Sequence, residues 1–433
     1  MVWNPPSEVS VEQIEAASRA AVERADEPIS VEQYLFTIES LGLEWDVGGA
    51  VYQPRGAVTT GPDGRPVGVF LIHGGGGDHR GFDTMARLLA RQKGYRVVTV
   101  TYPGNLYLGP DHGAADPYDW PGDTFGPDGA IRTPMWRRGE VIDSGQYDLV
   151  EEVGDDVFRA KYGTLMFLRA KPGTRFHDRL AAWPGAYEDA FVAACARFLP
   201  ADTYSIYASG VSTGGPFAHM LLQRVPNIVG LVGAESSPYG AIFSRMLGQG
   251  WPYDFDMMTI RTWRDVARYA GPEAGPEAYR RLPWLMEEVF EKHRSMTHRP
   301  LLKAQHLVQF AAVDPLEHAA QATARRLGLD EAGTKELVDR FTGYPFPLGE
   351  GARPVPPLLY CIMANSRDHT YQRYSEILLP ALAELDPAPK ASIVRFAVGV
   401  HSYQQPLGDL PFGTAPAVAD VWADAISGGY YLT

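Results

Sequence analysis

Residues 204–222, YSIYASGVSTGGPFAHMLL, place a G-x-S-x-G pattern centred on Ser212 between an apolar strand and an apolar helix. This arrangement is typical of a nucleophile elbow, a strained turn that raises a serine hydroxyl above the end of a sheet. The glycines, Gly210 and Gly214, let strand and helix pass closely, and the main-chain N–H of Thr213 would face a developing oxyanion. The alternative is that Ser212 only caps the helix, since serine is a favoured N-cap residue. The position between strand and helix favours the catalytic interpretation.

A run of four glycines precedes the elbow, in LIHGGGGD at residues 71–78. Glycine lets main chain approach another group closely. A dinucleotide site would need G-x-G-x-x-G and a phosphate loop would need Gly-Lys-Ser/Thr, and neither pattern is present. The remaining interpretation is a loop whose main-chain N–H groups hold an oxyanion. Within Gly74–Gly77 we therefore expect Gly75 and Gly76 to form an oxyanion hole together with Thr213.

A serine hydroxyl needs a base to remove its proton, and in this arrangement the base follows the last strand. Of the eleven histidines, His401 in FAVGVHSYQ has that position. The alternative is a surface histidine in a loop. We expect His73 to orient the glycine loop and His219 to pack within the helix after the elbow.

The acid that would orient His401 has two candidates. Glu235 ends a strand in VGAESSP, and Asp368 follows a later strand in MANSRDHTY. A glutamate at the end of an apolar strand has little reason to be charged unless it is paired, whereas Asp368 could cap a helix beginning near Tyr371. This asymmetry favours Glu235 and leaves Asp368 as the alternative.

The amino-acid composition argues against several classes of function. The chain of 433 residues has 39 Lys and Arg against 52 Asp and Glu, a net charge of −13, and no basic run, which argues against nucleic-acid binding. Its two cysteines, Cys195 and Cys361, lie in apolar segments and are expected to be buried free thiols. The sequence shows neither a signal peptide nor an apolar run of about 18 residues, so we expect a cytoplasmic protein that does not associate with membranes. No cluster implies a metal or an organic cofactor, and homo-oligomerisation stays open.

The order of elements predicts an α/β fold with a mostly parallel central sheet flanked by helices. We expect strands at about residues 34–38, 49–53, 67–72, 96–102, 204–208, 228–235, 357–363 and 392–398, and helices at about 10–25, 82–92, 186–198, 371–385 and 415–426. Residues 1–238 and 353–433 would form the core domain, with an irregular insertion at about 103–174. Residues 239–352 would form a large helical cap.

The segments STGGPFAHMLLQRVPNIVGLVGAESSPYG, HGGGG, ANSRDHTY and GVHSY resemble the bacterial carboxylesterases of the α/β-hydrolase superfamily. The resemblance implies the α/β-hydrolase fold, with Ser212 as nucleophile, Glu235 as acid, His401 as base and the glycine loop in the oxyanion hole. It covers the sheet-forming segments and neither insertion. Ser236 stands where these proteins commonly have proline.

Hydrolysis of a small-molecule carboxylic ester is therefore the leading functional hypothesis. Amide or lactone hydrolysis, acyl transfer or a lyase reaction could use the same three residues, and a binding protein could carry them idle. In the cap, the candidate pocket residues are Trp251, Tyr253 and Trp284, although aromatic residues at helical spacing are often plain core.

Overall fold

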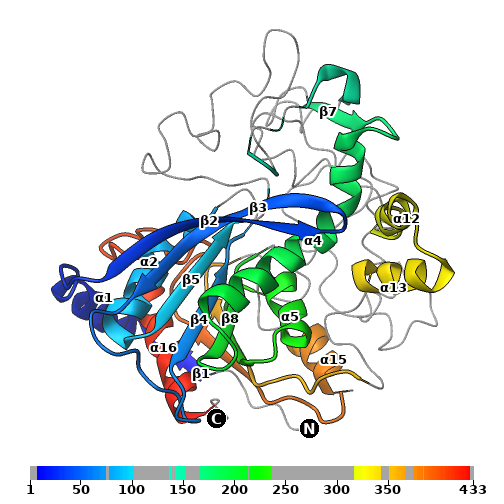
Figure 1. Ribbon diagram of the computed structural model, residues 1–433. Coiled ribbons are helices and arrows are strands. Elements are labelled where there is room, and N and C mark those ends of the chain that lie inside the picture. The colour runs from blue at the N-terminus through cyan, green and yellow to red at the C-terminus, as the bar shows by residue number, and fades with distance from the viewer. Residues whose placement is uncertain are drawn as a thin grey trace.

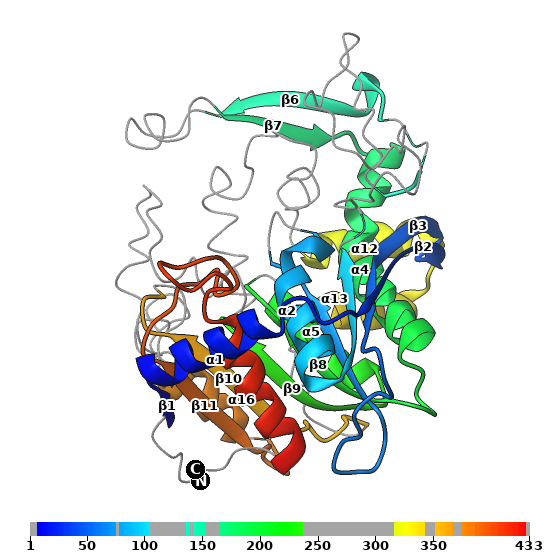
Figure 2. The same cartoon turned by 90° about the vertical axis from the view of Figure 1, so that its left-hand side faces the viewer.

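The computed structural model describes residues 7–74, 78–101, 103, 136–138, 140, 142–152, 165–212, 214–236, 316–342, 351–366, 374–383 and 385–429. Across these residues a nine-stranded sheet has the order β1–β11–β10–β9–β8–β4–β5–β3–β2 (Figures 1 and 2). Its strands are β1 (Ser7–Val9), β2 (Ser30–Ser40), β3 (Leu43–Gln53), β4 (Val67–Ile72), β5 (Arg96–Thr101), β8 (Ser205–Gly210), β9 (Ile228–Ala234), β10 (Leu358–Met363) and β11 (Ala391–Phe396). Only β3 runs against the others, pairing antiparallel with β2 and β5. The mostly parallel sheet predicted from the sequence is confirmed.

Helices cover both faces of this sheet, which is why its central strands are buried and mostly apolar. On one face lie α1 (Val11–Glu23), α2 (Asp83–Leu88) and α16 (Ala415–Gly428), and on the other lie α4 (Arg175–Phe198), α5 (Gly214–Arg224) and α15 (Leu379–Ala383) (Figure 1). Every residue of β4, β8 and β10 is buried, as expected of parallel strands covered on two sides. The carboxyl ends of these strands therefore meet at one edge, where ligand sites of open α/β sheets form.

Short helical turns and a second sheet complete the described elements. The turns are η1 (His79–Phe82), η2 (Leu89–Lys93), η4 (Ser144–Gln146) and η6 (Tyr374–Leu378). Strands β6 (Tyr147–Glu152) and β7 (Leu165–Ala170) pair only with each other, within the segment expected to be irregular. The other strands were predicted from the alternation of strands and helices along the chain. Strands β6 and β7 form a separate hairpin that does not follow this alternation, so they were not predicted. The short edge strand β1 was also not predicted.

The long helix α4 begins at Arg175 rather than near residue 186. Its N-cap is Thr174, whose side chain accepts a hydrogen bond from the N–H of His177. Pro and Gly occupy positions 184 and 185, directly before the predicted start, and the helix continues through both. A Cβ on Gly185 would lie 2.8 Å from atoms of Leu41 and Phe341, so this glycine lets other elements pack closely on an unbroken helix.

Two helices of the expected cap are described, α12 (Leu316–Leu327) and α13 (Glu331–Thr342). Both pack on α4, and they share a small apolar cluster that includes Ala320, Leu337 and Phe341. Arg340 of α13 reaches Glu188 and Asp189 of α4 at 3.1 and 2.6 Å. The helical character expected here holds for these residues, and the division into core and cap stays a prediction.

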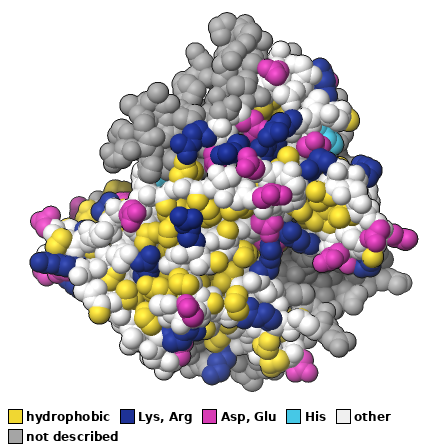
Figure 3. Space-filling model, viewed as in Figure 1, with side chains coloured by type: hydrophobic (Ala, Val, Ile, Leu, Met, Phe, Trp, Pro, Cys, Tyr) yellow, Lys and Arg dark blue, Asp and Glu magenta, His cyan; other side chains and the backbone are white. Residues whose placement is uncertain are grey.

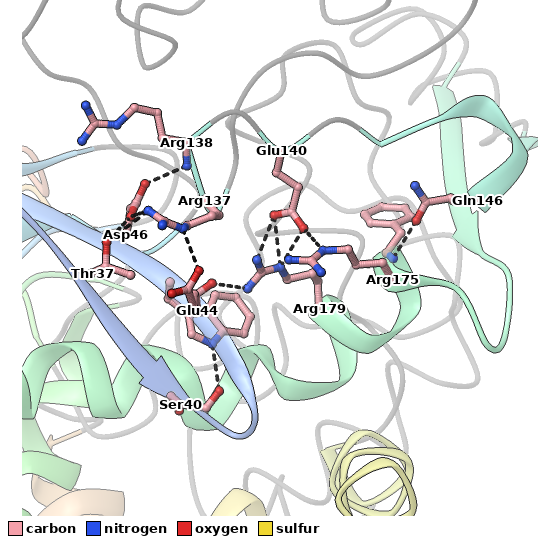
Figure 4. A network of polar contacts seen from close by, with 12 residues as sticks. Thr37, Ser40, Glu44, Asp46, Arg137, Arg138, Glu140, Gln146, Arg175 and Arg179 are labelled. Atoms are coloured by element: carbon pink, nitrogen blue, oxygen red, sulfur yellow. Dashed lines mark hydrogen bonds and ion pairs between the residues drawn. The ribbon is translucent and has the colours of Figure 1, made fainter.

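A network of ion pairs fixes the β2–β3 hairpin to α4 (Figure 4). The fully buried Arg179 bonds to Glu140 at 3.0 Å, and its guanidinium lies 4.6 Å from the centre of the Trp45 ring. Asp46, also fully buried, accepts bonds from Nη1 of Arg137 at 3.0 Å and from the N–H of Arg138 at 2.7 Å. Because each buried charge has a partner, the desolvation cost of burying them is offset.

The surface carries charges of both signs. On the face shown in Figure 3, basic and acidic side chains are interspersed over the described residues. Within the described part of the chain, no helix combines the length and the apolar character needed to cross a bilayer.

The start of α5 packs so tightly on the end of β4 that alanine does not fit at position 214. A Cβ there would lie 2.5 Å from the carbonyl oxygen of Ile72 and 2.6 Å from that of His73. We expect Gly214→Ala to lower the free energy of unfolding by about 2 kcal/mol or more, because a backbone clash cannot be relieved by a rotamer change. Gly81→Ala is the control, since its Cβ would meet nothing within 4 Å. Equal denaturant midpoints for the two variants would contradict this packing.

Candidate active site

Ser212 lies at the sharp turn between β8 and α5, at the carboxyl edge of the sheet. Its φ is +53°, a conformation that side chains other than glycine rarely adopt. A Cβ on Gly210 would lie 2.1 Å from the carbonyl oxygen of Gly214, so the turn has no room for a larger residue at its first glycine. The turn closes with bonds from the N–H of Gly214 to Val211 and from the N–H of Gly215 to Ser212. This geometry is that of a nucleophile elbow.

Glu235 follows β9 directly and contacts both Ser212 and His401. The N–H of Ser212 donates to the main-chain carbonyl of Glu235 at 3.0 Å. Nδ1 of His401 lies 3.1 Å from Oε2 of Glu235. An ionised carboxylate can only accept, so Nδ1 carries the hydrogen and, in the neutral ring, Nε2 carries the lone pair that a base requires. The structure thus brings Glu235 and His401 together beside the elbow.

The Glu235 carboxylate is fully buried and accepts several hydrogen bonds. Oε1 accepts from the N–H of Met363 at 2.8 Å, and Oε2 accepts from the hydroxyl of Ser366 as well as from His401. Burial raises the pKa of this carboxyl, and the bonds from His401, Ser366 and Met363 oppose the rise. Like Ser212, Glu235 has a positive φ, +51°. Of the three described residues other than glycine with positive φ, two therefore lie at this site.

The glycine loop starts against the elbow. A Cβ on Gly74 would lie 3.2 Å from Cβ of Ser212, so glycine lets the loop approach the serine. Nδ1 of His73 lies 2.7 Å from the carbonyl oxygen of Gly74, to which it can only donate. Burial lowers the pKa of His73 to about 4, which keeps the ring neutral. The expected role of His73 in orienting the loop agrees with this contact.

The far end of the glycine loop is held to β5. The N–H of His79 donates to the hydroxyl oxygen of Thr101 at 2.8 Å, and Nδ1 of the same ring lies 2.9 Å from that oxygen. The side chain of Asp78 accepts from the N–H of Arg80 and caps the start of η1. Both ends of the loop are therefore anchored, one on the elbow and one on the neighbouring strand.

Several predicted site residues lie outside the described residues and stay predictions: Gly75, Gly76, Thr213, Asp368, Trp251, Tyr253 and Trp284. His219 is buried in α5, with Nδ1 2.7 Å from the carbonyl oxygen of Gly215 and Nε2 2.8 Å from the hydroxyl of Tyr360, as expected of a packing residue. Sequence reasoning did not identify Ser366, although it lies two residues before the candidate acid Asp368. Among the described side chains, no three of His, Cys, Asp or Glu lie together as metal ligands would.

Because the pKa of Glu235 is raised in the folded protein, the free energy of unfolding should depend on pH. A carboxyl with a raised pKa in the folded state resists ionisation that the unfolded chain undergoes, so it costs stability above its unfolded pKa, near 4.5. Below that pH both states are protonated and the cost disappears. Relative to Glu235→Gln, the wild-type protein should therefore gain stability as the pH falls from 7 towards 4.5. Denaturant unfolding of both proteins across this range tests it, and a difference independent of pH would contradict it.

No protein-family model and no curated protein matches this chain. Solved structures similar to it include the acylaminoacyl peptidase of Pyrococcus horikoshii, at 13% identity and a TM-score of 0.40, of which the chain spans 44% while 95% of this chain is covered. A bacterial heroin esterase matches at 14% identity and a TM-score of 0.41, over 97% of this chain and 94% of that one. Est1E from Butyrivibrio proteoclasticus matches at 11% identity and a TM-score of 0.36, over 90% of this chain and 98% of that one. With identities and TM-scores this low, the fold is assigned from the chain's own sheet and elbow, and it is the α/β-hydrolase fold.

Proposed function

We propose that the protein is a serine hydrolase that cleaves carboxylic esters of small molecules through an acyl-enzyme on Ser212. His401 is the base and Glu235 is the acid that orients it. The observation that carries the proposal is the 3.1 Å contact between Nδ1 of His401 and the buried Glu235, next to a serine held at positive φ. A buried carboxylate that contacts a histidine beside a strained elbow has no evident structural purpose, since simpler apolar packing would be more stable.

In the proposed reaction the Ser212 hydroxyl attacks the ester carbonyl while Nε2 of His401 accepts its proton. The resulting imidazolium is stabilised by the Glu235 carboxylate. Main-chain N–H groups of Thr213 and of the glycine loop, including Gly75 and Gly76, hold the oxyanion. His401 then returns the proton to the departing alcohol, and water, activated by the same imidazole, releases the acid. An aromatic wall from Trp251, Tyr253 and Trp284 would suit an apolar substrate.

Replacing Ser212 by alanine tests the nucleophile. Ser212→Ala should lower kcat for short p-nitrophenyl esters by about 10⁴-fold or more and abolish labelling by a fluorophosphonate, because the proposed acyl intermediate forms on the oxygen that this substitution removes. Ser402→Ala, at an exposed serine in the loop that carries His401, is the matched control and should keep both properties. Labelling that persists in Ser212→Ala would remove this serine from the role. Product analysis with an added alcohol would reveal acyl transfer in place of hydrolysis.

Paired substitutions test the acid. Glu235→Gln should lower kcat by about 10⁴-fold, because an amide cannot stabilise the imidazolium or fix the ring in the required tautomer. Asp368→Asn, at the alternative position, should leave kcat within a few-fold of wild type. The reverse pattern, a large loss with Asp368→Asn and a small one with Glu235→Gln, would assign the acid to Asp368.

A further inference from the structure

The loop after β10 reaches the acid of the site through a hydroxyl. Ser366, 8% exposed, donates a hydrogen bond to Oε2 of Glu235, the same oxygen that meets Nδ1 of His401. The N–H of Met363 holds the other oxygen at 2.8 Å. Two donors from the end of β10 thus fix both oxygens of the carboxylate.

Strand order explains why β10 supplies these donors. Glu235 directly follows β9 and His401 follows β11, with β10 between these two strands. Neighbouring strands lie about 4.8 Å apart, so the glutamate side chain must pass over the end of β10 to reach the histidine. Where it passes, it leaves water and needs donors from the protein. Met363 and Ser366 stand at that point.

The loop that presents Ser366 is itself held by main-chain bonds. The N–H of Ala364 donates to Phe396 at 3.0 Å, and the N–H of Ser366 donates to Met363 at 3.0 Å. Asn365 and Gly399 bond reciprocally: the N–H of Asn365 donates to the Gly399 carbonyl at 2.9 Å, and Oδ1 of Asn365 accepts from the N–H of Gly399 at 3.2 Å. The loop is therefore tied to the chain two residues before His401, and the Ser366 hydroxyl is presented from a fixed position.

We propose that Ser366 is a positioning residue of the reaction: its hydroxyl holds the Glu235 carboxylate in the orientation in which Oε2 meets Nδ1 of His401. The inference rests on the proposed function. Without this hydroxyl, the main-chain N–H of Met363 would be the one described donor, apart from the imidazole itself, that opposes rotation of the carboxylate. Ser366 acts through Glu235 and touches no reacting atom.

The Ser366 hydroxyl should also influence the protonation of the pair formed by Glu235 and His401. With the histidine neutral the pair carries one negative charge, and with the histidine protonated it is neutral, so a donor aimed at Oε2 stabilises the unprotonated pair more. Besides His401, the described titratable groups that face the carboxylate are Tyr374, Tyr403 and Cys361, and burial raises the pKa of each. Near neutral pH only the pair titrates. Removing the hydroxyl should therefore move the acidic limb of the kcat/KM profile to higher pH.

The experiment compares Ser366→Ala with Ser366→Thr and Ser236→Ala. Ser236 is the matched control because it is buried next to Glu235 and its hydroxyl has no hydrogen-bond partner among the residues that the structure describes. With active sites counted by fluorophosphonate titration, Ser366→Ala should lower kcat about tenfold at unchanged KM and shift the acidic limb upward. Ser366→Thr keeps the donor, so the acidic limb of its kcat/KM profile should match that of the wild type and most of kcat should be retained. Ser236→Ala should change neither kcat nor the acidic limb.

A purely structural role for Ser366 would give a different result. Ser366→Ala would then lower the unfolding midpoint and the number of active sites, while kcat per active site and the acidic limb stayed at their wild-type values, and this outcome would overturn the proposal. NMR titration of the His401 ring, assigned with His401→Gln and repeated in the Ser212→Ala background, measures the same shift without turnover. If Ser212→Ala hydrolyses esters, the proposed function fails. If Ser212→Ala is inactive and Ser366→Ala behaves as wild type in rate and titration, only the role of Ser366 fails.

Discussion

A carboxylate without access to water is the constraint on which the rest of this site depends. Glu235 is fully buried, and an ionised group there is stable only if hydrogen-bond donors replace the lost solvent. The donors come from the end of β10, from the loop after it and from the loop after β11. These segments are far apart in sequence and meet only when the parallel sheet has formed. The donors that offset the burial of the Glu235 carboxylate therefore come together only in the folded sheet.

Backbone strain at the elbow is a second unfavourable contribution to the free energy of folding, at the same edge of the sheet. Ser212 and Glu235 both have positive φ, and such residues persist only where the surrounding structure holds them. Here the holding contact is the bond from the N–H of Ser212 to the carbonyl of Glu235 at 3.0 Å, which joins the two strained residues. Close packing of Gly214 on β4 prevents the turn from relaxing in the other direction. Strain and burial at the site are thus supported by packing elsewhere in the sheet, as is common where activity and stability conflict.

Features of the site that depend on neighbouring residues could be predicted from the sequence, and features that depend on contacts between distant residues could not. The elbow was predictable because its steric demand is local: glycines at 210 and 214 stand two residues from the serine that needs them. The place of His401 after the last strand was predictable from chain order alone. Ser366 was not, because its role depends on which strand lies between β9 and β11, and a single serine carries no pattern. The start of α4 was mispredicted because Gly185 is required by the packing of Leu41 and Phe341, contacts that local propensity does not record.

The two candidate acids, Glu235 and Asp368, follow strands that lie at different distances from the loop that carries His401. An acid after β10 would lie beside the loop that carries the histidine, and a short aspartate would suffice there. An acid after β9 must cross one further strand spacing of about 4.8 Å, which a glutamate, with one more methylene, is better able to do. A side chain crossing that distance lies over the end of β10 and is sensitive to what that end presents. In this chain it presents a main-chain N–H and a hydroxyl, so the end of β10 and the loop after it contribute hydrogen-bond donors to the Glu235 carboxylate, which comes from the neighbouring strand.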